Sequence, residues 1–136
     1  MTRNQTVEIN HLTVLQIQYL TELEQLEKGR GIIGAVAAKC GVKHPTVSRF
    51  FKSCIEKGYL TESLEFTDKG KKMLRWHQKV QKDVREYLER SGITEGIDDV
   101  LKGMIENIDY RRLEELTKSH MRINKEIRMQ KEQNQI

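Results

Sequence analysis

The stretch from Gly34 to Leu60 constrains the fold more than any other part of the sequence. It holds two short helical segments with Gly41 between them, and glycine is well suited to a tight turn between two helices. Pro45, the only proline of the chain, stands where the second segment begins, and its fixed φ suits the first turn of a helix. The stretch therefore predicts a helix-turn-helix.

The second helical segment has an apolar side and a polar, basic side. At about 100° per residue, one arc of the helical wheel holds apolar residues and a glycine: Val47, Phe50, Phe51, Cys54 and Gly58. The opposite arc holds Pro45, Arg49, Lys52 and Glu56, with Thr46, Ser48 and Ser53 on its flanks. A short helix that is held to a core on one side and carries basic and hydroxyl groups on the other is suited to the major groove of DNA.

Positive charge is concentrated in the same stretch. The chain of 136 residues has a net charge of +4, and residues 39–57 contain five cations and a single carboxylate, which is a surplus of the same size. Acidic residues gather elsewhere, around Glu24 and Asp98. A basic patch on an otherwise balanced chain is what contacts to DNA phosphates require.

The expected elements follow the order of a winged helix-turn-helix domain. The patterns predict three helices and then two short antiparallel strands, over residues 11–28, 32–40, 45–57, 59–61 and 64–66. Another helix follows, with Thr67 or Asp68 as its N-cap. We expect a mainly α fold with a small β-hairpin, in which residues 1–70 form the winged helix-turn-helix domain.

Residues 71–136 are expected to form a helical dimerisation region. The sequence predicts a long helix over 71–90, a shorter helix over 94–107 and a last helix capped by Asp109. The last helix has a seam at spacings of three and four, formed by Leu113, Leu116, His120, Ile123, Ile127 and Gln130. Two interpretations stay open, because this seam can pair with a second copy of the chain or pack on the same subunit.

Three short segments together resemble a known family. They are Pro45–Ser48 (PTVS), Gly58–Leu60 (GYL) and Thr67–Lys72 (TDKGKK). With the long helix that follows, they are similar to the iron- and manganese-dependent repressors of the diphtheria toxin repressor family. The similarity runs from about Leu12 to about Leu116, and the PTVS and Thr-x-Lys-Gly signals are also common in the MarR family of regulators, the second choice. The resemblance implies a homodimer that binds double-stranded DNA.

The resemblance and the polar arc together give a set of predicted DNA-binding residues. They are Lys43, His44, Pro45, Thr46, Ser48, Arg49 and Lys52. Arg49 is the candidate for a bidentate contact to guanine, whereas Lys43 and Lys52 are candidates for phosphate contacts. His44 is expected to cap the helix or to approach a phosphate.

The sequence departs from that family at the positions of its metal ligands. Where the family has Met or Asp, Glu, His and Cys, this chain has mostly neutral, bulky or cationic side chains: Gln16, Tyr19, Gln81, Arg85, Lys102, Ile105 and Glu106. These lack the donors that a divalent transition metal needs, so we predict no cofactor and expect metal sensing to be lost or altered. The alternative is a metal-gated repressor with a displaced ion site, formed by His77 with Glu106 or Asp99. The other interpretation of His77 is a histidine packed on an apolar helix face with a hydrogen-bond partner.

Other classes of protein find little support in the sequence. The chain has no serine elbow, phosphate-binding glycine loop or recognisable carboxylate pair, so we predict no enzyme. The longest uncharged run, from Ile9 to Thr21, is shorter than the ~20 residues of a membrane helix, and the N-terminus does not look like a signal peptide. Cys40 and Cys54 lie at apolar positions without a CxxC motif, as free thiols do in a reducing compartment.

The sequence thus predicts a cytoplasmic, homodimeric DNA-binding transcriptional regulator that acts as a repressor and has no membrane segment. The remaining alternative from a different class is a winged-helix protein-interaction module whose basic face is incidental.

Overall fold

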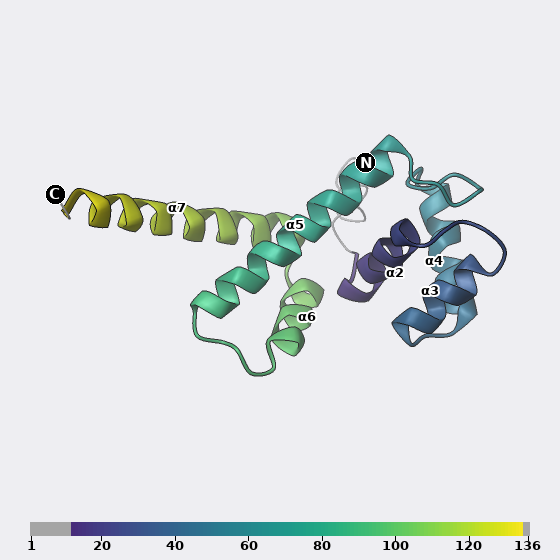
Figure 1. Cartoon of the computed structure of the whole chain (residues 1–136), viewed down its shortest axis with the longest axis horizontal. Helices are drawn as coiled ribbons and strands as arrows, with labels where there is room; N and C mark the ends of the chain where they lie inside the picture. Colours follow the sequence, from purple (N-terminus) through teal and green to yellow (C-terminus); the bar gives the residue numbers. More distant parts are fainter. Residues whose placement is uncertain (1–11, 135–136) are drawn as a thin grey trace. The chain divides into compact units, whose positions relative to one another are not determined.

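The computed structural model describes residues 12–134, apart from the side chains of Met121 and Asn124 (Figure 1). These residues form α2 (Val14–Gln25), α3 (Ile32–Cys40), α4 (His44–Glu56), α5 (Asp68–Arg90), α6 (Ile97–Asn107) and α7 (Tyr110–Asn134). The prediction of a mainly α fold is confirmed. None of these helices is both long and apolar enough to cross a membrane.

The described chain divides into two compact units. The first unit comprises Leu12–Gln78, the second begins at Lys79, and α5 contributes residues to both. The predicted division at residue 70 separates a winged helix-turn-helix domain from a dimerisation region. The two compact units do not test that division, so it stays a prediction.

α2 opens the first unit with a capping box. The hydroxyl of Thr13 accepts a hydrogen bond from the N–H of Gln16 (3.1 Å), and the side-chain oxygen of Gln16 accepts one from the N–H of Thr13 (3.0 Å). The helix ends at Gln25, three residues before the predicted Lys28, because the backbone is already extended at Leu26. The predicted first residue, His11, lies outside the described residues.

One apolar core joins the segments of the first unit. Its buried side chains are Leu12, Ile17, Tyr19, Leu20, Leu23, Val36, Ala37, Val47, Phe50, Phe51, Cys54, Tyr59, Leu60, Met73 and Leu74. Tyr19 of α2 meets Phe50 of α4 edge to face, with the ring centroids 5.8 Å apart. All four side chains of the predicted apolar arc of α4 are in this core, so that prediction is confirmed.

The predicted β-hairpin after α4 is wrong. No strand is formed between residues 12 and 134, and one antiparallel bridge joins Leu60 to Phe66. Two hydrogen bonds form this bridge, from the N–H of Thr61 to the carbonyl of Glu65 (2.8 Å) and from the N–H of Thr67 to the carbonyl of Tyr59 (3.1 Å). Beyond it the bonds are local, since the carbonyl of Thr61 accepts from the N–H of Leu64 (2.9 Å) and its hydroxyl accepts from the N–H of Glu65 (3.1 Å). Leu64 adopts a left-handed φ of 63°, which interrupts an extended strand. Segments of three residues are too short to form a ladder against these local bonds.

The Thr-x-Lys-Gly segment forms the junction between this loop and α5. The hydroxyl of Thr67 donates to the carbonyl of Gly58 (2.6 Å) and accepts from the N–H of Gly70 (3.0 Å), so Thr67 is the N-cap of α5. A Cβ on Gly70 would lie 2.0 Å from the carbonyl oxygen of Tyr59, which leaves no room for any other residue. The motif therefore has a structural explanation within the first unit.

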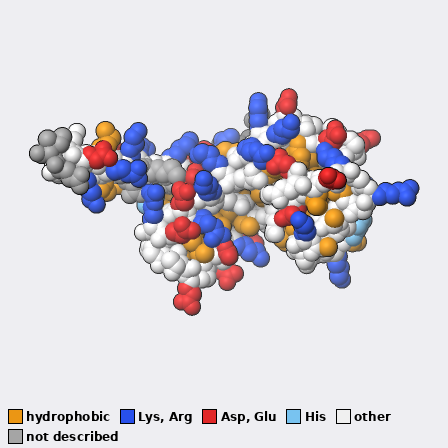
Figure 2. Space-filling model, viewed as in Figure 1, with side chains coloured by type: hydrophobic (Ala, Val, Ile, Leu, Met, Phe, Trp, Pro, Cys, Tyr) orange, Lys and Arg blue, Asp and Glu red, His pale blue; other side chains and the backbone are white. Residues whose placement is uncertain are grey.

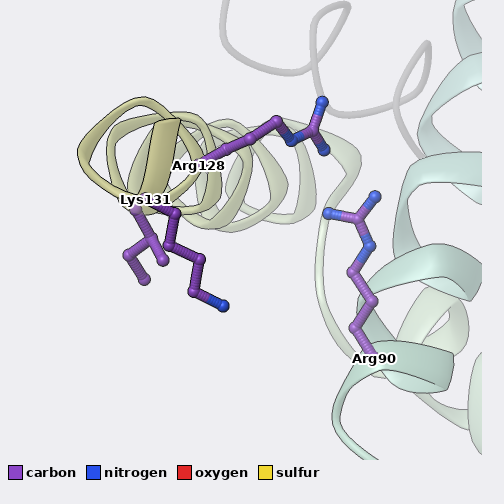
Figure 3. A pocket seen from close by; sticks show the side chains of 4 residues that line it. Arg90, Arg128 and Lys131 are labelled. Carbon is purple, nitrogen blue, oxygen red and sulfur yellow. The ribbon is translucent and has the colours of Figure 1, made fainter. Parts of the chain in front are cut away.

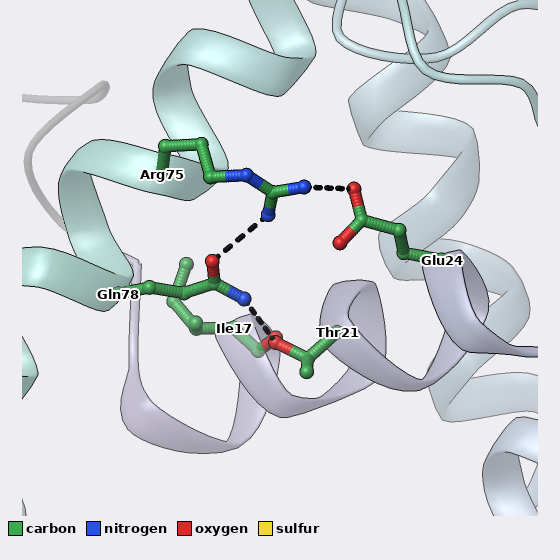
Figure 4. Close-up of polar contacts among 5 residues, drawn as sticks. All are labelled: Ile17, Thr21, Glu24, Arg75 and Gln78. Atoms are coloured by element: carbon green, nitrogen blue, oxygen red, sulfur yellow. Dashed lines mark hydrogen bonds and ion pairs between the residues drawn. The ribbon is translucent and has the colours of Figure 1, made fainter.

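A chain of polar contacts joins α5 to α2 (Figure 4). Arg75 binds Glu24 (2.5 Å) and donates to the side-chain oxygen of Gln78 (2.9 Å). Gln78 donates to the hydroxyl of Thr21 (2.9 Å), which in turn donates to the carbonyl of Ile17 (2.8 Å). These contacts fix the rotation of the first half of α5 against α2.

The second unit is built from the rest of α5 with α6 and α7. Its buried apolar side chains are Val80, Val84, Leu88, Leu101, Ile105, Tyr110 and Leu113. Gln81 donates to the hydroxyl of Tyr110 (3.0 Å), and burial raises the pKa of Tyr110 to about 12. Asp109 caps α7 as predicted, because its carboxylate accepts from the N–H of Arg112 (3.0 Å).

Candidate nucleic-acid interface

α3 and α4 form the predicted helix-turn-helix. α3 ends at Cys40 and α4 begins at His44, so residues 41–43 make the turn. Gly41 has a φ of 67°, and the N–H of Val42 donates to the carbonyl of Ala37 (3.0 Å) to close the end of α3. A turn of three residues around a left-handed glycine is the usual connection in a DNA-binding helix-turn-helix.

α4 begins one residue earlier than predicted, so Pro45 takes its second position. Lys43 is the N-cap, and no side chain caps the helix there. Proline has no backbone N–H, and in the first turn of a helix this group would have no partner within the helix. Pro45 therefore costs α4 no hydrogen bond. The positive end of the helix dipole lies beside the polar residues of this first turn.

The predicted DNA-binding residues lie along the side of α4 that faces away from the core. Lys43, His44, Pro45, Thr46, Arg49 and Lys52 are exposed, and Ser48 is half-buried. The structure thus brings all seven to one accessible surface, here called the basic face. Their contacts with DNA stay a prediction.

The cations of the basic face have no carboxylate partners within residues 12–134. None of Lys43, Arg49 and Lys52 takes part in an ion pair there, whereas Lys39 of α3 lies 3.6 Å from Glu22. A cation without a neighbouring carboxylate contributes its full field to the surface and gives up no existing contact when it meets a phosphate.

Three lysines follow the junction after α4 closely, Lys69, Lys71 and Lys72, and one of them is held within it. Lys69 donates to the carbonyl of Lys57 (2.9 Å) and lies 5.3 Å from the centroid of the Tyr59 ring. Its ammonium group is therefore already bound within the junction. Lys71 and Lys72 are exposed in the first turn of α5 and remain available.

The candidate metal ligands are not brought together as a cluster. His77 is fully buried in the first unit and its Nδ1 lies 2.7 Å from the carbonyl oxygen of Met73, so that this nitrogen carries the proton and donates it. Asp99 and Glu106 are exposed residues of the second unit. The described residues include no group of three His, Cys, Asp or Glu that could hold a metal ion. The packed, hydrogen-bonded histidine is the interpretation of His77 that agrees with the structure.

Several positions that correspond to metal ligands in the resembling family have structural roles here. Gln81 binds Tyr110, and Arg85 pairs with Asp98 near the start of α6. Ile105 is buried in the second unit. These three side chains are therefore held by contacts within the second unit, and the loss of metal sensing stays a prediction.

A groove in the second unit was not foreseen from the sequence. Arg90 at the end of α5 and Arg128 and Lys131 near the end of α7 line it together with Ile127. Figure 3 shows the guanidinium groups of Arg90 and Arg128 turned toward the same space. In sequence these cations are far apart, and the parallel course of α5 and α7, in which Gln81 meets Tyr110 and Tyr87 meets His120, brings them together.

The arrangement of α3 and α4 is that of a helix-turn-helix, and the family match below assigns it to the winged class. Residues 20–94, more than half of the chain, match the family described as "wHTH-PRTase associated", and the chain belongs to that family. No curated protein and no solved structure matches the chain. The family is neither of the two that the sequence motifs resemble, so the resemblance to the metal-dependent repressors and to the MarR regulators stays a prediction.

Proposed function

We propose that the chain is a DNA-binding transcriptional regulator, a cytoplasmic repressor without enzymatic activity, that reads a two-fold operator as a homodimer. Each subunit inserts α4 into a major groove, with the basic face toward the DNA. Its resemblance to metal-dependent and MarR-type repressors supports the repressor role. The lack of a metal-ligand cluster among the described residues supports a regulator whose binding does not depend on a metal ion.

The observation that carries this proposal is the division of α4 between core and solvent. Val47, Phe50, Phe51 and Cys54 hold one side of the helix in the core. The other side presents three cations without ion pairs in the described chain, next to a helix start without a side-chain cap. A solvated helix face needs no such concentration of positive charge, whereas contact with phosphates and bases does.

Arg49 is the residue with the clearest expected role in base recognition. Its planar guanidinium can donate two hydrogen bonds to one guanine, and it lies in the second turn of α4, within reach of the base edges. Lys43 and Lys52 flank it along the helix and fit phosphate contacts, which position the helix without reading sequence.

The test begins with selection of a preferred duplex from a random-sequence library, followed by fluorescence anisotropy with that duplex. Arg49→Ala is expected to weaken binding by about 1–3 kcal/mol and to relax the preference at one base pair. Arg30→Ala is the matched control, because Arg30 is an exposed arginine of the first unit without an ion pair in the described chain. Equal affinity for Arg49→Ala and Arg30→Ala would overturn the role of the basic face.

The salt dependence of DNA binding tests the phosphate contacts, and a chelator tests whether binding depends on a metal ion. Lys52→Ala is expected to weaken binding to all duplexes alike and to reduce the slope of log K against log salt by about 1. A chelator is expected to leave wild-type binding unchanged. A loss of binding on chelation would instead favour the metal-gated alternative.

A second candidate function is favoured by the description of the family. It associates the winged helix-turn-helix with a PRTase, the usual abbreviation of phosphoribosyltransferase. In this alternative the domain is an interaction module that docks on such an enzyme, and the basic face is incidental. No affinity for any duplex at low salt, together with a stable complex between the purified chain and a purified PRTase, would favour the module over the regulator.

A further inference from the structure

α7 carries apolar side chains that the described part of the chain leaves partly exposed. Leu113 in its first turn is buried, but Leu116, Ile123 and Ile127 are 39%, 55% and 46% exposed. The last three lie on one side of the helix, since their spacings of seven and four residues correspond to nearly whole turns. Figure 2 shows hydrophobic surface on α7 between charged side chains. These three residues are here called the open stripe.

The second unit uses the neighbouring side of α7 for its own packing. Leu113 and Thr117 are buried, and the ring of His120 stands edge to face against Tyr87 of α5 with the centroids 4.8 Å apart. At about 100° per residue, these positions lie to one side of the open stripe rather than on it. The open stripe therefore remains accessible while α7 is docked in its own unit.

Charged residues line the other edge of the open stripe in a symmetrical pattern. Glu115, Arg122 and Glu126 are exposed and take part in no ion pair within residues 12–134. Arg112, exposed at the start of the stripe, lies 3.5 Å from Asp109. The signs alternate along the helix as plus, minus, plus and minus.

This pattern is complementary to itself when two copies of α7 run in opposite directions. Arg112 and Glu126 each lie seven residues from Ser119, on opposite sides of it. A two-fold axis near Ser119 therefore brings Arg112 of each copy against Glu126 of the other copy. The same axis brings Glu115 to the level of Arg122, within one residue. In an antiparallel pair the same edge of both helices meets, which these contacts require.

Two of the three apolar residues of the open stripe, Leu116 and Ile123, satisfy the same register. Leu116 and Ile123 lie three and four residues from Ser119 on opposite sides, so Leu116 of one copy packs on Ile123 of the other. A parallel pair would instead turn the charged edge toward the edge of Leu113 and Thr117, which the second unit already buries. The antiparallel arrangement thus joins apolar and charged residues at once.

We infer that α7 pairs antiparallel with α7 of a second copy of this chain, with the two-fold axis near Ser119. This inference deepens the homodimer of the proposed function by naming its interface and register. The two-fold symmetry makes the interface isologous, as closed dimers of identical chains require.

Sedimentation equilibrium of the full chain tests the interface. Ile123→Lys introduces a charge into the open stripe and is expected to raise the dimer dissociation constant at least tenfold. Met129→Lys is the matched control, because Met129 is also an exposed apolar residue of α7 (51%) but lies on another side of the helix. Circular dichroism of both variants verifies that the helices are retained. A wild-type chain that stays monomeric at all concentrations, or an Ile123→Lys chain as dimeric as Met129→Lys, would overturn the inference.

A charge exchange tests the register. Glu115→Arg and Arg122→Glu each create like-charge pairs in the homodimer, so each variant alone is expected to dissociate several-fold more readily than the wild type. Mixing the two variants restores opposite charges at both sites of a heterodimer, and association is expected to recover. If the mixture associates no better than either variant alone, the antiparallel register is wrong.

DNA binding separates this inference from the proposed function. The monomeric Ile123→Lys chain keeps the basic face, so it is expected to bind a half-site duplex with the affinity of one wild-type subunit. A wild-type chain that dimerises through α7 but binds no DNA would refute the regulator and leave the inference standing. A chain that binds DNA as a dimer unaffected by Ile123→Lys would refute only the inference.

Discussion

α4 and α7 are both amphipathic helices, but the chain buries the apolar side of α4 and leaves much of the apolar side of α7 exposed. The four buried side chains of α4 lie in one core with residues of α2, α3 and α5, so its apolar side is covered within the first unit. The apolar residues of α7 are covered in its first turns and exposed from Leu116 onward. A helix of the first kind leaves only its polar side for a partner, whereas a helix of the second kind offers an apolar side as well.

This difference indicates two kinds of partner. The exposed side of α4 is basic, and a polyanion such as DNA is what it can bind without exposing any apolar surface. The exposed side of α7 is apolar with alternating charges at its edge, and a second helix of matching pattern is what it can bind. In the proposed function, α4 thus serves recognition from the first unit and α7 serves assembly from the second.

The largest expected effect comes from truncating a buried side chain of α4, in comparison with an exposed apolar side chain of α7. Phe51→Ala removes a ring of α4 that is 1% exposed and is expected to destabilise the first unit by about 4 kcal/mol, because it leaves a cavity. Ile123→Ala is expected to change the stability of the monomeric chain by less than about 0.5 kcal/mol, because more than half of this residue is already exposed to water. Urea unfolding followed by the fluorescence of Trp76, the only tryptophan, reports on the first unit. Far-UV circular dichroism of the dilute chain reports on Ile123→Ala. Similar costs for both changes would break the comparison.

The next effect concerns the junction that holds the end of α4 to α5. Gly70→Ala is expected to destabilise the first unit by about 3 kcal/mol, because the new Cβ would meet the backbone of Tyr59, which cannot rotate away. Gly34→Ala in α3 is the matched control, since its new Cβ has only an ordinary contact with His44. That change is expected to stabilise the helix by about 0.5–1 kcal/mol. Equal stability of the two variants in urea would contradict the tight junction.

The sequence was sufficient for α4 and insufficient for α7, and the reason is physical. The helical wheel of α4 predicted its buried and exposed sides correctly. The hydrophobic periodicity, the glycine turn and the proline all depend on contacts between residues that are near neighbours in sequence. For α7 the same periodicity left intrachain and intermolecular packing open, because the pattern shows that a side is apolar but not what covers it. The structure divides the seam, with Leu113 packed inside and Ile123 outside.

The hairpin and the cationic groove fall outside what periodicity can predict. Tyr59 to Phe66 has the residue types of two strands, but side-chain and turn bonds around Thr61 satisfy the groups that a ladder would use. Arg90 and Lys131 share a groove because of how α5 and α7 run in the second unit, which no local pattern contains. The DNA contacts of Arg49 and its neighbours remain a prediction from sequence type and exposure.

The reactivity of the two thiols, Cys54 and Cys40, tests whether the apolar side of α4 is closed to solvent. Burial raises the pKa of Cys54 in α4 to about 12, and burial together with the charge of Glu22 raises that of half-exposed Cys40. A raised pKa leaves less thiolate, so at pH 8 Cys54 is expected to react with an aromatic disulfide reagent at least about a hundredfold more slowly than Cys40. Cys40→Ser and Cys54→Ser assign the two phases, and urea is expected to equalise them. Equal rates in the native chain would mean that the apolar side of α4 is not closed.

The smallest effect concerns the polar contacts around the same core. Arg75→Ala removes the ion pair with Glu24 and the hydrogen bond to Gln78, but its side chain is 57% exposed and water replaces much of what is lost. We expect a loss of about 0.5 kcal/mol in the stability of the first unit, measured by urea unfolding at low salt and smaller at high salt. Arg30→Ala, which removes no ion pair in the described chain, is expected to have no measurable effect. A loss above about 2 kcal/mol for Arg75→Ala would show that the contact between α5 and α2 depends on this polar chain. A value near 0.5 kcal/mol would show that the apolar core alone completes the unit that carries α4.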